Sequence, residues 1–104
     1  MKIVFHLEYQ TTFGEELMLN IMQGDQPGEP HKMLTTDGRL WTCEIVTMTK
    51  PGTYVDYYYS VVRGDEVMRR EWLVVPHRLE FSARKGVRYT VYDHWLDIPE
   101  NSFL

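Results

Sequence analysis

Two pairs of adjacent carboxylates are the residues of this sequence that best suit acid–base catalysis: Glu15 with Glu16, and Asp65 with Glu66. Cleavage of a glycosidic bond by two carboxylates requires that they face each other across a cleft at about 5 to 9.5 Å. Acids that are neighbours in the chain and lie among turn residues do not face each other in this way. We therefore interpret both pairs as parts of solvated loops.

The other residue types that carry out catalysis lack the neighbours they need. Cys43 is the only cysteine, so it completes neither a thiolate zinc site nor an intrachain disulfide. Ser60 and Ser82 lie in no Gly-x-Ser-x-Gly motif and have no recognisable base beside them. The histidines, which show no paired ligand spacing, are His6, His31, His77 and His94. The sequence predicts no catalytic residue, no metal site, no cofactor and no enzyme activity of this chain.

Aromatic residues are in surplus, with three Trp, seven Tyr and four Phe among 104 residues. Most such side chains pack in cores. Five are harder to assign to a core: Trp41, Tyr58, Trp72, Tyr92 and Trp95. Trp41 follows a turn, Tyr58 falls among polar positions, and Trp72 ends a charged hairpin. An exposed ring is a surface on which the C–H face of a pyranose stacks. The composition alone leaves core packing, a protein interface and glycan binding open.

The elements that position these residues are predicted to be strands, because apolar residues alternate with polar ones at a period of two. Clusters of Gly, Pro and Asp separate the alternating runs and supply the turns. The predicted strands lie within residues 2–9, 17–22, 41–45, 55–61, 67–72, 79–81 and 87–92. This pattern predicts an all-β fold, an immunoglobulin-like antiparallel β-sandwich of about seven short strands, with almost no helix.

Length and charge restrict the organisation and the partners. A chain of 104 residues fits one domain, and we place the sandwich in residues 1–97 and the start of a linker to a following domain in residues 98–104. The net charge of -4 disfavours a nucleic-acid partner. The sequence has no apolar run long enough for a membrane helix and no secretory signal, so we expect a cytoplasmic protein with no membrane partner.

Five segments of the chain occur in the same order as in a known domain family. Over nearly its whole length the chain resembles a starch-binding domain of carbohydrate-binding module family 20. The most specific motifs are the Thr-Thr-aromatic-Gly-Glu run from Thr11, a Trp-x-x-Pro-x-Arg segment with longer spacing from Trp72, and the Asp-x-Trp that ends at Trp95. The segments that carry the resemblance are residues 5–17, 40–41, 56–59, 71–78 and 91–95.

The last segment of the sequence resembles a more specific group of modules. Residues 92–99 are similar to the module that precedes the catalytic barrel in 4-α-glucanotransferases of glycoside hydrolase family 77. This implies a non-catalytic module that binds an α-1,4-glucan, such as starch, glycogen or a maltooligosaccharide. Its further partner is then a catalytic domain of the same polypeptide, to which the transferase activity belongs.

The resemblance also implies three site residues. Trp72 matches the second tryptophan of the family's first glucan site, Tyr58 falls on the lysine position of that site, and Trp41 matches the tryptophan of the second site. Gln26 stands where the first site has its other tryptophan, and Met18 where we place a tyrosine of the second site. One stacking ring contributes only about 1 kcal/mol, so we expect weak binding.

An alternative function follows from the replacement of family aromatic residues by Gln26 and Met18. A module that has lost its sugar sites would serve as a structural or protein-docking domain. Glucan binding predicts that Trp72, Tyr58 and Trp41 are exposed, whereas docking predicts that these rings are covered or share one apolar patch.

Overall fold

The computed structural model describes residues 2–22, 30–46, 53–71, 76–81 and 88–96. These residues form nine strands and no helix, and so contain no helix that is long and apolar enough to span a bilayer. In chain order the strands are β1 (Lys2–Glu8), β2 (Glu16–Ile21), β3 (Pro30–Lys32), β4 (Leu34–Thr35), β5 (Leu40–Val46), β6 (Tyr54–Arg63), β7 (Glu66–Arg70), β8 (His77–Glu80) and β9 (Tyr89–His94).

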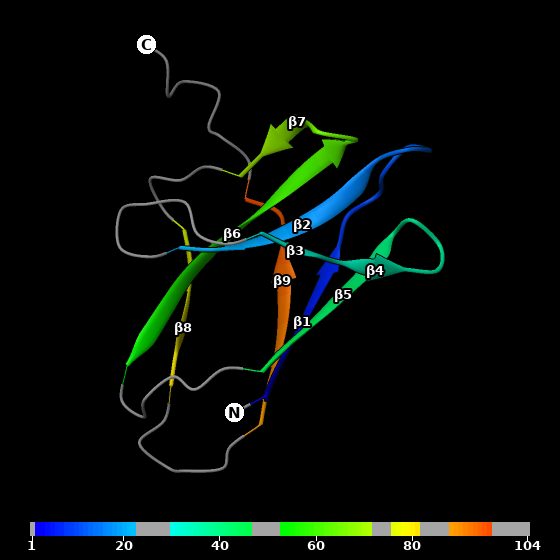
Figure 1. The fold of residues 1–104 in the computed structure, drawn as a ribbon. Coiled ribbons are helices and arrows are strands. Elements are labelled where there is room, and N and C mark those ends of the chain that lie inside the picture. The colour runs from blue at the N-terminus through cyan, green and yellow to red at the C-terminus, as the bar shows by residue number, and fades with distance from the viewer. Residues whose placement is uncertain (1, 23–29, 47–52, 72–75, 82–87, 97–104) are drawn as a thin grey trace.

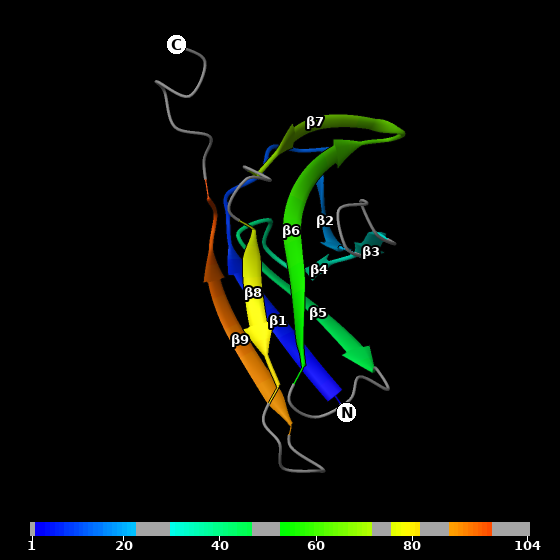
Figure 2. The same cartoon turned by 90° about the vertical axis from the view of Figure 1, so that its left-hand side faces the viewer.

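The strands form two sheets that pack as a β-sandwich (Figures 1 and 2). One sheet has four strands in the order β4-β5-β1-β9, and the other has five, with the path β3-β2-β6-β7 and β8 beside β6. All pairs among the described strands are antiparallel except β1 with β9, which run parallel. The first and last described strands therefore lie side by side in one sheet.

The long strand β6 organises the five-stranded sheet and curves along it (Figure 2). One edge of β6 pairs with β2. Its other edge is shared, because β8 pairs with Tyr54 to Tyr57 and β7 pairs with Ser60 to Arg63. The register shifts between Val61 and Val62, where β7 joins β6.

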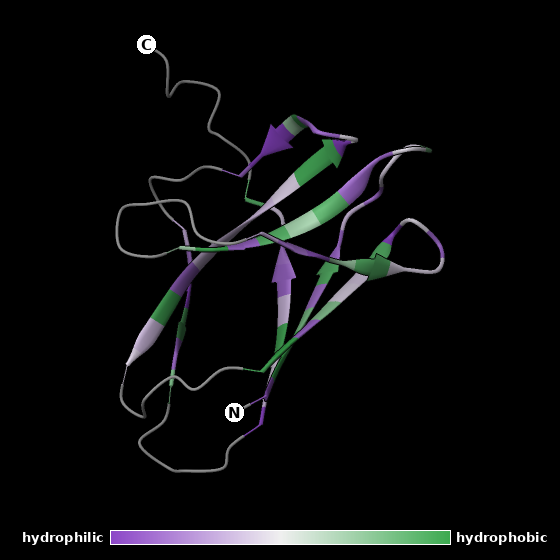
Figure 3. Cartoon of the chain, in the orientation of Figure 1, coloured by the Kyte–Doolittle hydropathy of each residue, from purple (hydrophilic) through white to green (hydrophobic). Residues whose placement is uncertain are grey.

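The core lies between the sheets and follows the predicted alternation. Hydrophobic and polar positions alternate along β1 and β5, as Figure 3 shows. The inward residues come from both sheets, so their burial holds the two layers together. The buried hydrophobic cluster comprises Ile3, Phe5, Leu7, Leu17, Leu19, Met33, Trp41, Cys43, Tyr57, Tyr59, Val61 and Phe81.

The described part of the chain confirms the predicted all-β sandwich and has two strands, β3 and β4, that were not predicted. Strands β3 and β4 have three and two residues, too few to produce a periodic pattern in the sequence. The expected linker at residues 98–104 lies outside the described residues.

A buried polar cluster is centred on Glu71, whose side chain is only 1 % exposed. Its Oε1 accepts a hydrogen bond from the Tyr59 amide at 2.7 Å, and its Oε2 accepts one from the Leu96 amide at 2.6 Å. His77 Nε2 lies 2.8 Å from the same Oε2. One carboxylate thus ties β6, β8 and the chain that follows β9 together.

Asp93 of β9 completes this cluster from the opposite sheet. Its Oδ2 accepts hydrogen bonds from the hydroxyls of Tyr57 and Tyr59, each at 2.7 Å. Its Oδ1 lies 3.6 Å from His77 Nδ1. Burial, the hydrogen bond to Asp93 and nearby negative charge raise the pKa of Tyr57 well above its ordinary value, so its hydroxyl remains a donor.

Candidate functional site

The loop between β1 and β2 folds into a tight turn that places Phe13 at its tip. The Thr12 carbonyl accepts a hydrogen bond from the Glu15 amide at 3.1 Å, and Glu15 Oε1 accepts one from the Thr12 amide at 2.8 Å. Gly14 has φ of 90°, a left-handed conformation that glycine adopts without strain. The turn is closed from both ends by these reciprocal bonds.

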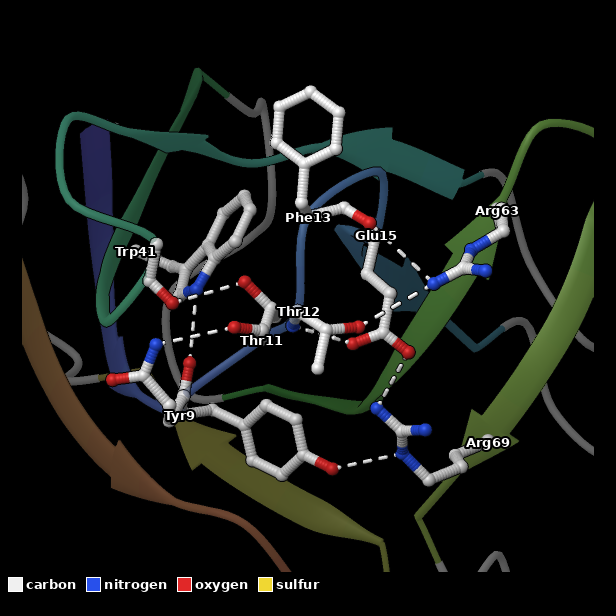
Figure 4. A network of polar contacts seen from close by, with 10 residues as sticks. Tyr9, Thr11, Thr12, Phe13, Glu15, Trp41, Arg63 and Arg69 are labelled. Carbon is white, nitrogen blue, oxygen red and sulfur yellow. Dashed lines mark hydrogen bonds and ion pairs between the residues drawn. The ribbon is translucent and has the colours of Figure 1, made fainter.

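Two arginines from the β6 and β7 ribbon brace this turn (Figure 4). Arg69 pairs with Glu15 Oε2 at 2.9 Å, and its Nε donates to the Tyr9 hydroxyl at 3.0 Å. Arg63 Nη2 lies 3.4 Å from both the Thr12 hydroxyl and the Phe13 carbonyl oxygen. The loop that carries Phe13 is thus attached to the edge of the five-stranded sheet.

The sequence analysis placed Glu15 in a solvated loop, and this is wrong, because its side chain is buried. The hydrogen bond from the Thr12 amide holds the pKa of Glu15 below its usual value, against the opposing effect of desolvation and with help from Arg69. Its neighbour Glu16 forms an exposed ion pair with Lys32 at 3.3 Å. The two acids point to different partners and do not face each other.

A second turn, between β4 and β5, lies against the first. Asp37 Oδ1 accepts hydrogen bonds from the amides of Arg39 and Leu40, each at 2.9 Å. The bonds from Leu40 and Arg39 lower the pKa of Asp37. Gly38, with φ of 73°, presents its carbonyl oxygen to the amide and hydroxyl of Thr11, each at 3.0 Å. These bonds join the two turns into one surface.

Phe13 is fully exposed on this surface, and Figure 4 shows its ring pointing away from the polar network. Two shallow hollows of about 370 and 360 Å³ adjoin it. Both are lined by Phe13, Gly14, Glu15, Thr35 and Trp41. A free aromatic ring beside hydroxyls and backbone groups is an arrangement that receives one face of a sugar ring and hydrogen-bonds its rim.

The glucan-binding hypothesis predicted an exposed Trp41, but only 4 % of the surface of this residue is exposed. It pairs with Leu7 and shares the inward face of β5 with Cys43, so strand alternation directs it into the core. Its indole Nε1 donates to the Tyr9 carbonyl oxygen at 3.1 Å. Trp41 still lines both hollows beside Phe13, as part of their floor.

The same hypothesis predicted an exposed Tyr58, which is also buried, with 9 % of its surface accessible. As the sequence predicted, it faces the opposite side of β6 from Tyr57 and Tyr59. That side is not open here: Asn20 and Ser60 are buried with Tyr58, and Asn20 Nδ2 donates to the Tyr58 carbonyl at 3.3 Å. Trp72 lies outside the described residues, so the site expected for Trp72 and Tyr58 stays a prediction.

Phe13 is the surface residue that the sequence analysis did not single out. It belongs to the Thr-Thr-aromatic-Gly-Glu run that supported the family resemblance. Its place between Thr12 and Gly14, outside the alternation of both flanking strands, was the signal for an exposed ring. Within residues 2–22, 30–46, 53–71, 76–81 and 88–96, no group of three or more His, Cys, Asp or Glu side chains is arranged to hold a metal ion.

No protein-family model and no curated protein sequence matches the chain. Two solved glucoamylase structures are similar to it. A glycoside hydrolase family 15 glucoamylase from Hypocrea jecorina superposes with a TM-score of 0.73 and 17 % identity, over 93 % of this chain and 17 % of that one. The Hormoconis resinae glucoamylase gives 0.65 and 22 %, over 98 % and 18 %. The chain spans less than a fifth of either, and at these identities the likeness shows the fold alone.

Proposed function

We propose that this domain is a non-catalytic module that binds α-1,4-glucan weakly, with Phe13 as the ring on which a glucose unit stacks. The observation that carries the proposal is the fully exposed Phe13, held over two hollows by a braced loop. The resemblance to starch-binding domains and the structural likeness to part of two glucoamylases support the choice of ligand. Trp41 contributes the floor of the same surface.

Preorganisation explains how one ring is sufficient for useful binding. The contacts of Arg63 and Arg69 already fix the loop, so a sugar need not order it on binding. One stacking contact contributes about 0.5 to 1.5 kcal/mol beyond the area it buries, which places the affinity near the millimolar range. Trp72 and Tyr58 are proposed as the remains of the first glucan site that the family resemblance implies.

The larger setting of the module is also part of the proposal. We place it beside the catalytic domain of a cytoplasmic 4-α-glucanotransferase of glycoside hydrolase family 77, because residues 92–99 are similar to the module that precedes that barrel. A tethered module raises the local concentration of glucan at the enzyme to which it is joined, even when its own affinity is weak.

The test is a titration of the domain with maltoheptaose, followed by amide chemical shifts. We expect saturable shifts in residues 11–15 and 35–41, with a dissociation constant near the millimolar range. Phe13→Ala should weaken binding about tenfold or abolish it, and Phe13→Tyr, which keeps the ring, should retain it. An unchanged affinity of a folded Phe13→Ala would rule out this ring, and no response at tens of millimolar sugar would rule out glucan binding.

A second candidate function is a protein-docking domain, and one observation favours it. Trp41 and Tyr58 are covered, as this alternative predicts. Leu34, which is exposed and lines a hollow with Phe13, adds apolar surface that a protein partner would contact. Absence of a response to glucan in the titration, with the fold intact, would leave this alternative.

A further inference from the structure

A second aromatic surface lies on the outer face of the four-stranded sheet. His6 of β1 and Tyr92 of β9 are direct neighbours in the parallel pairing. Their rings stack with centroids 4.6 Å apart and planes 9° apart. Tyr92 is 76 % exposed, because strand alternation directs its side chain away from the core. The stack holds an exposed tyrosine ring in one orientation.

A hollow of about 310 Å³ adjoins this stack, across β9, β1 and β5. This volume is at the lower end for small-molecule sites, which suits one or two sugar rings. Its outward-facing lining combines the stacked rings with Glu8, Leu40, Thr42 and His94. The hollows beside Phe13 share only Trp41 with it.

The polar groups of the hollow are suited to a neutral polyhydroxylated ligand. Both hydrogen bonds between Arg39 and Glu8 end on Oε1, at 2.7 and 3.1 Å, so Oε2 can accept a bond from a ligand hydroxyl. Thr42 adds a hydroxyl that both donates and accepts, and His94 adds ring nitrogens. Leu40, exposed at the rim, offers aliphatic surface to the C–H groups of a sugar.

We infer that this hollow is a second carbohydrate-binding site, which receives a pyranose of an α-glucan against the His6 and Tyr92 stack. The inference rests on the proposed function for the class of ligand, but on separate residues for the site. A domain with two sites contacts one polysaccharide at two points, so its apparent affinity for an insoluble glucan exceeds that of either site alone.

The test is the same maltoheptaose titration, read at a different place and with different variants. We expect saturable amide shifts in residues 6–8, 40–42 and 92–94, in addition to those around Phe13. Tyr92→Ala should weaken the response at this face about threefold to tenfold and leave that of the Phe13 loop unchanged. Tyr92→Phe should retain it. The matched control is Tyr54→Ala, because the guanidinium of Arg78 covers the Tyr54 ring at 3.9 Å.

The outcomes separate this inference from the proposed function. Shifts confined to the Phe13 loop, unaffected by Tyr92→Ala, would overturn the second site and leave the first. Shifts confined to the β1 and β9 face, lost in Tyr92→Ala, would support the second site and reject Phe13 as the stacking ring. No saturable shift at either place would overturn both. Adsorption to insoluble starch that falls at least tenfold in each single variant would support joint action.

Discussion

Replacement of Glu71 by alanine is expected to be among the most damaging single changes to this domain. The carboxylate is buried and accepts bonds from two backbone amides, those of Tyr59 and Leu96, and it contacts His77. Glu71→Ala removes all three contacts and leaves the buried Tyr59 amide, the partly buried Leu96 amide and His77 without their acceptor. The fold keeps its hydrophobic core, so the loss arises from unpaired polar groups.

The magnitude follows from the number of groups left unpaired. A buried donor that loses its partner costs about 1 to 3 kcal/mol, and breaking a buried charged pair by removing one member costs about 3 to 5 kcal/mol. These costs overlap, so we expect the free energy of unfolding to fall by about 3 to 5 kcal/mol. A small domain has about 5 to 15 kcal/mol in total, so this loss would leave a domain at the low end of that range only partly folded.

Urea unfolding followed by tryptophan fluorescence measures this change. With an m-value of about 2 kcal/mol/M, the midpoint should fall by about 1.5 to 2.5 M. Glu66→Ala, an exposed glutamate on β7, is the control and should change stability by less than about 0.5 kcal/mol. If Glu71→Ala does not fold, Glu71→Gln, which keeps one acceptor oxygen, should cost about 1 to 3 kcal/mol. A change in Glu71→Ala below 1 kcal/mol would refute the reasoning.

Two further predictions concern pH and backbone conformation. Burial alone lowers the pKa of His77, but the hydrogen bond to Glu71 and the charges of Glu71 and Asp93 raise it overall. Its stabilisation is present below about pH 6.5 and is lost as the pH rises through the higher folded pKa. The difference in unfolding free energy between wild type and His77→Gln should therefore shrink from about pH 6 to 9, and a constant difference would contradict it. Gly38→Ala should lower the free energy of unfolding by about 1 to 2 kcal/mol, because φ is 73° and the added Cβ would lie 3.4 Å from the Thr11 hydroxyl. Gly38→Asn should lower it less, because asparagine tolerates this φ, and thermal melts of both variants measure the difference.

The fold was predictable because alternation and burial coincide in strands such as β1 and β5. In β1 the inward residues Ile3, Phe5 and Leu7 are those that the period of two selected. The parallel partnership of β1 with β9 was not predictable, because no local signal in either strand specifies a partner at the other end of the chain. The two-residue strand β4 has no alternation to detect and depends on its partner β5.

The candidate site was less predictable, for a different reason. The exposure of a ring depends on which groups surround it. The alternation of residues along a strand predicts only which face of the sheet a side chain lies on. The alternation of β6 placed Tyr58 on the outer face correctly, but Tyr58 is buried there, as are Asn20 and Ser60. Conversely, Phe13 belongs to no strand, so the braced turn decides its exposure. The buried role of Glu15 also requires Arg69, which is distant in sequence.

The parallel pairing of β1 and β9 has a consequence for the order in which the domain forms. Ile3 pairs with Tyr89, and Glu8 with His94, so this part of the sheet joins the first and last described strands. Contacts of such large sequence separation require a long loop to close before they stabilise anything, and domains rich in them fold in milliseconds to seconds. During synthesis the edge of β1 lacks this neighbour until the residues of β9 have been made. A pulse-labelling experiment on refolding would therefore find the amides of β1 that face β9 protected late.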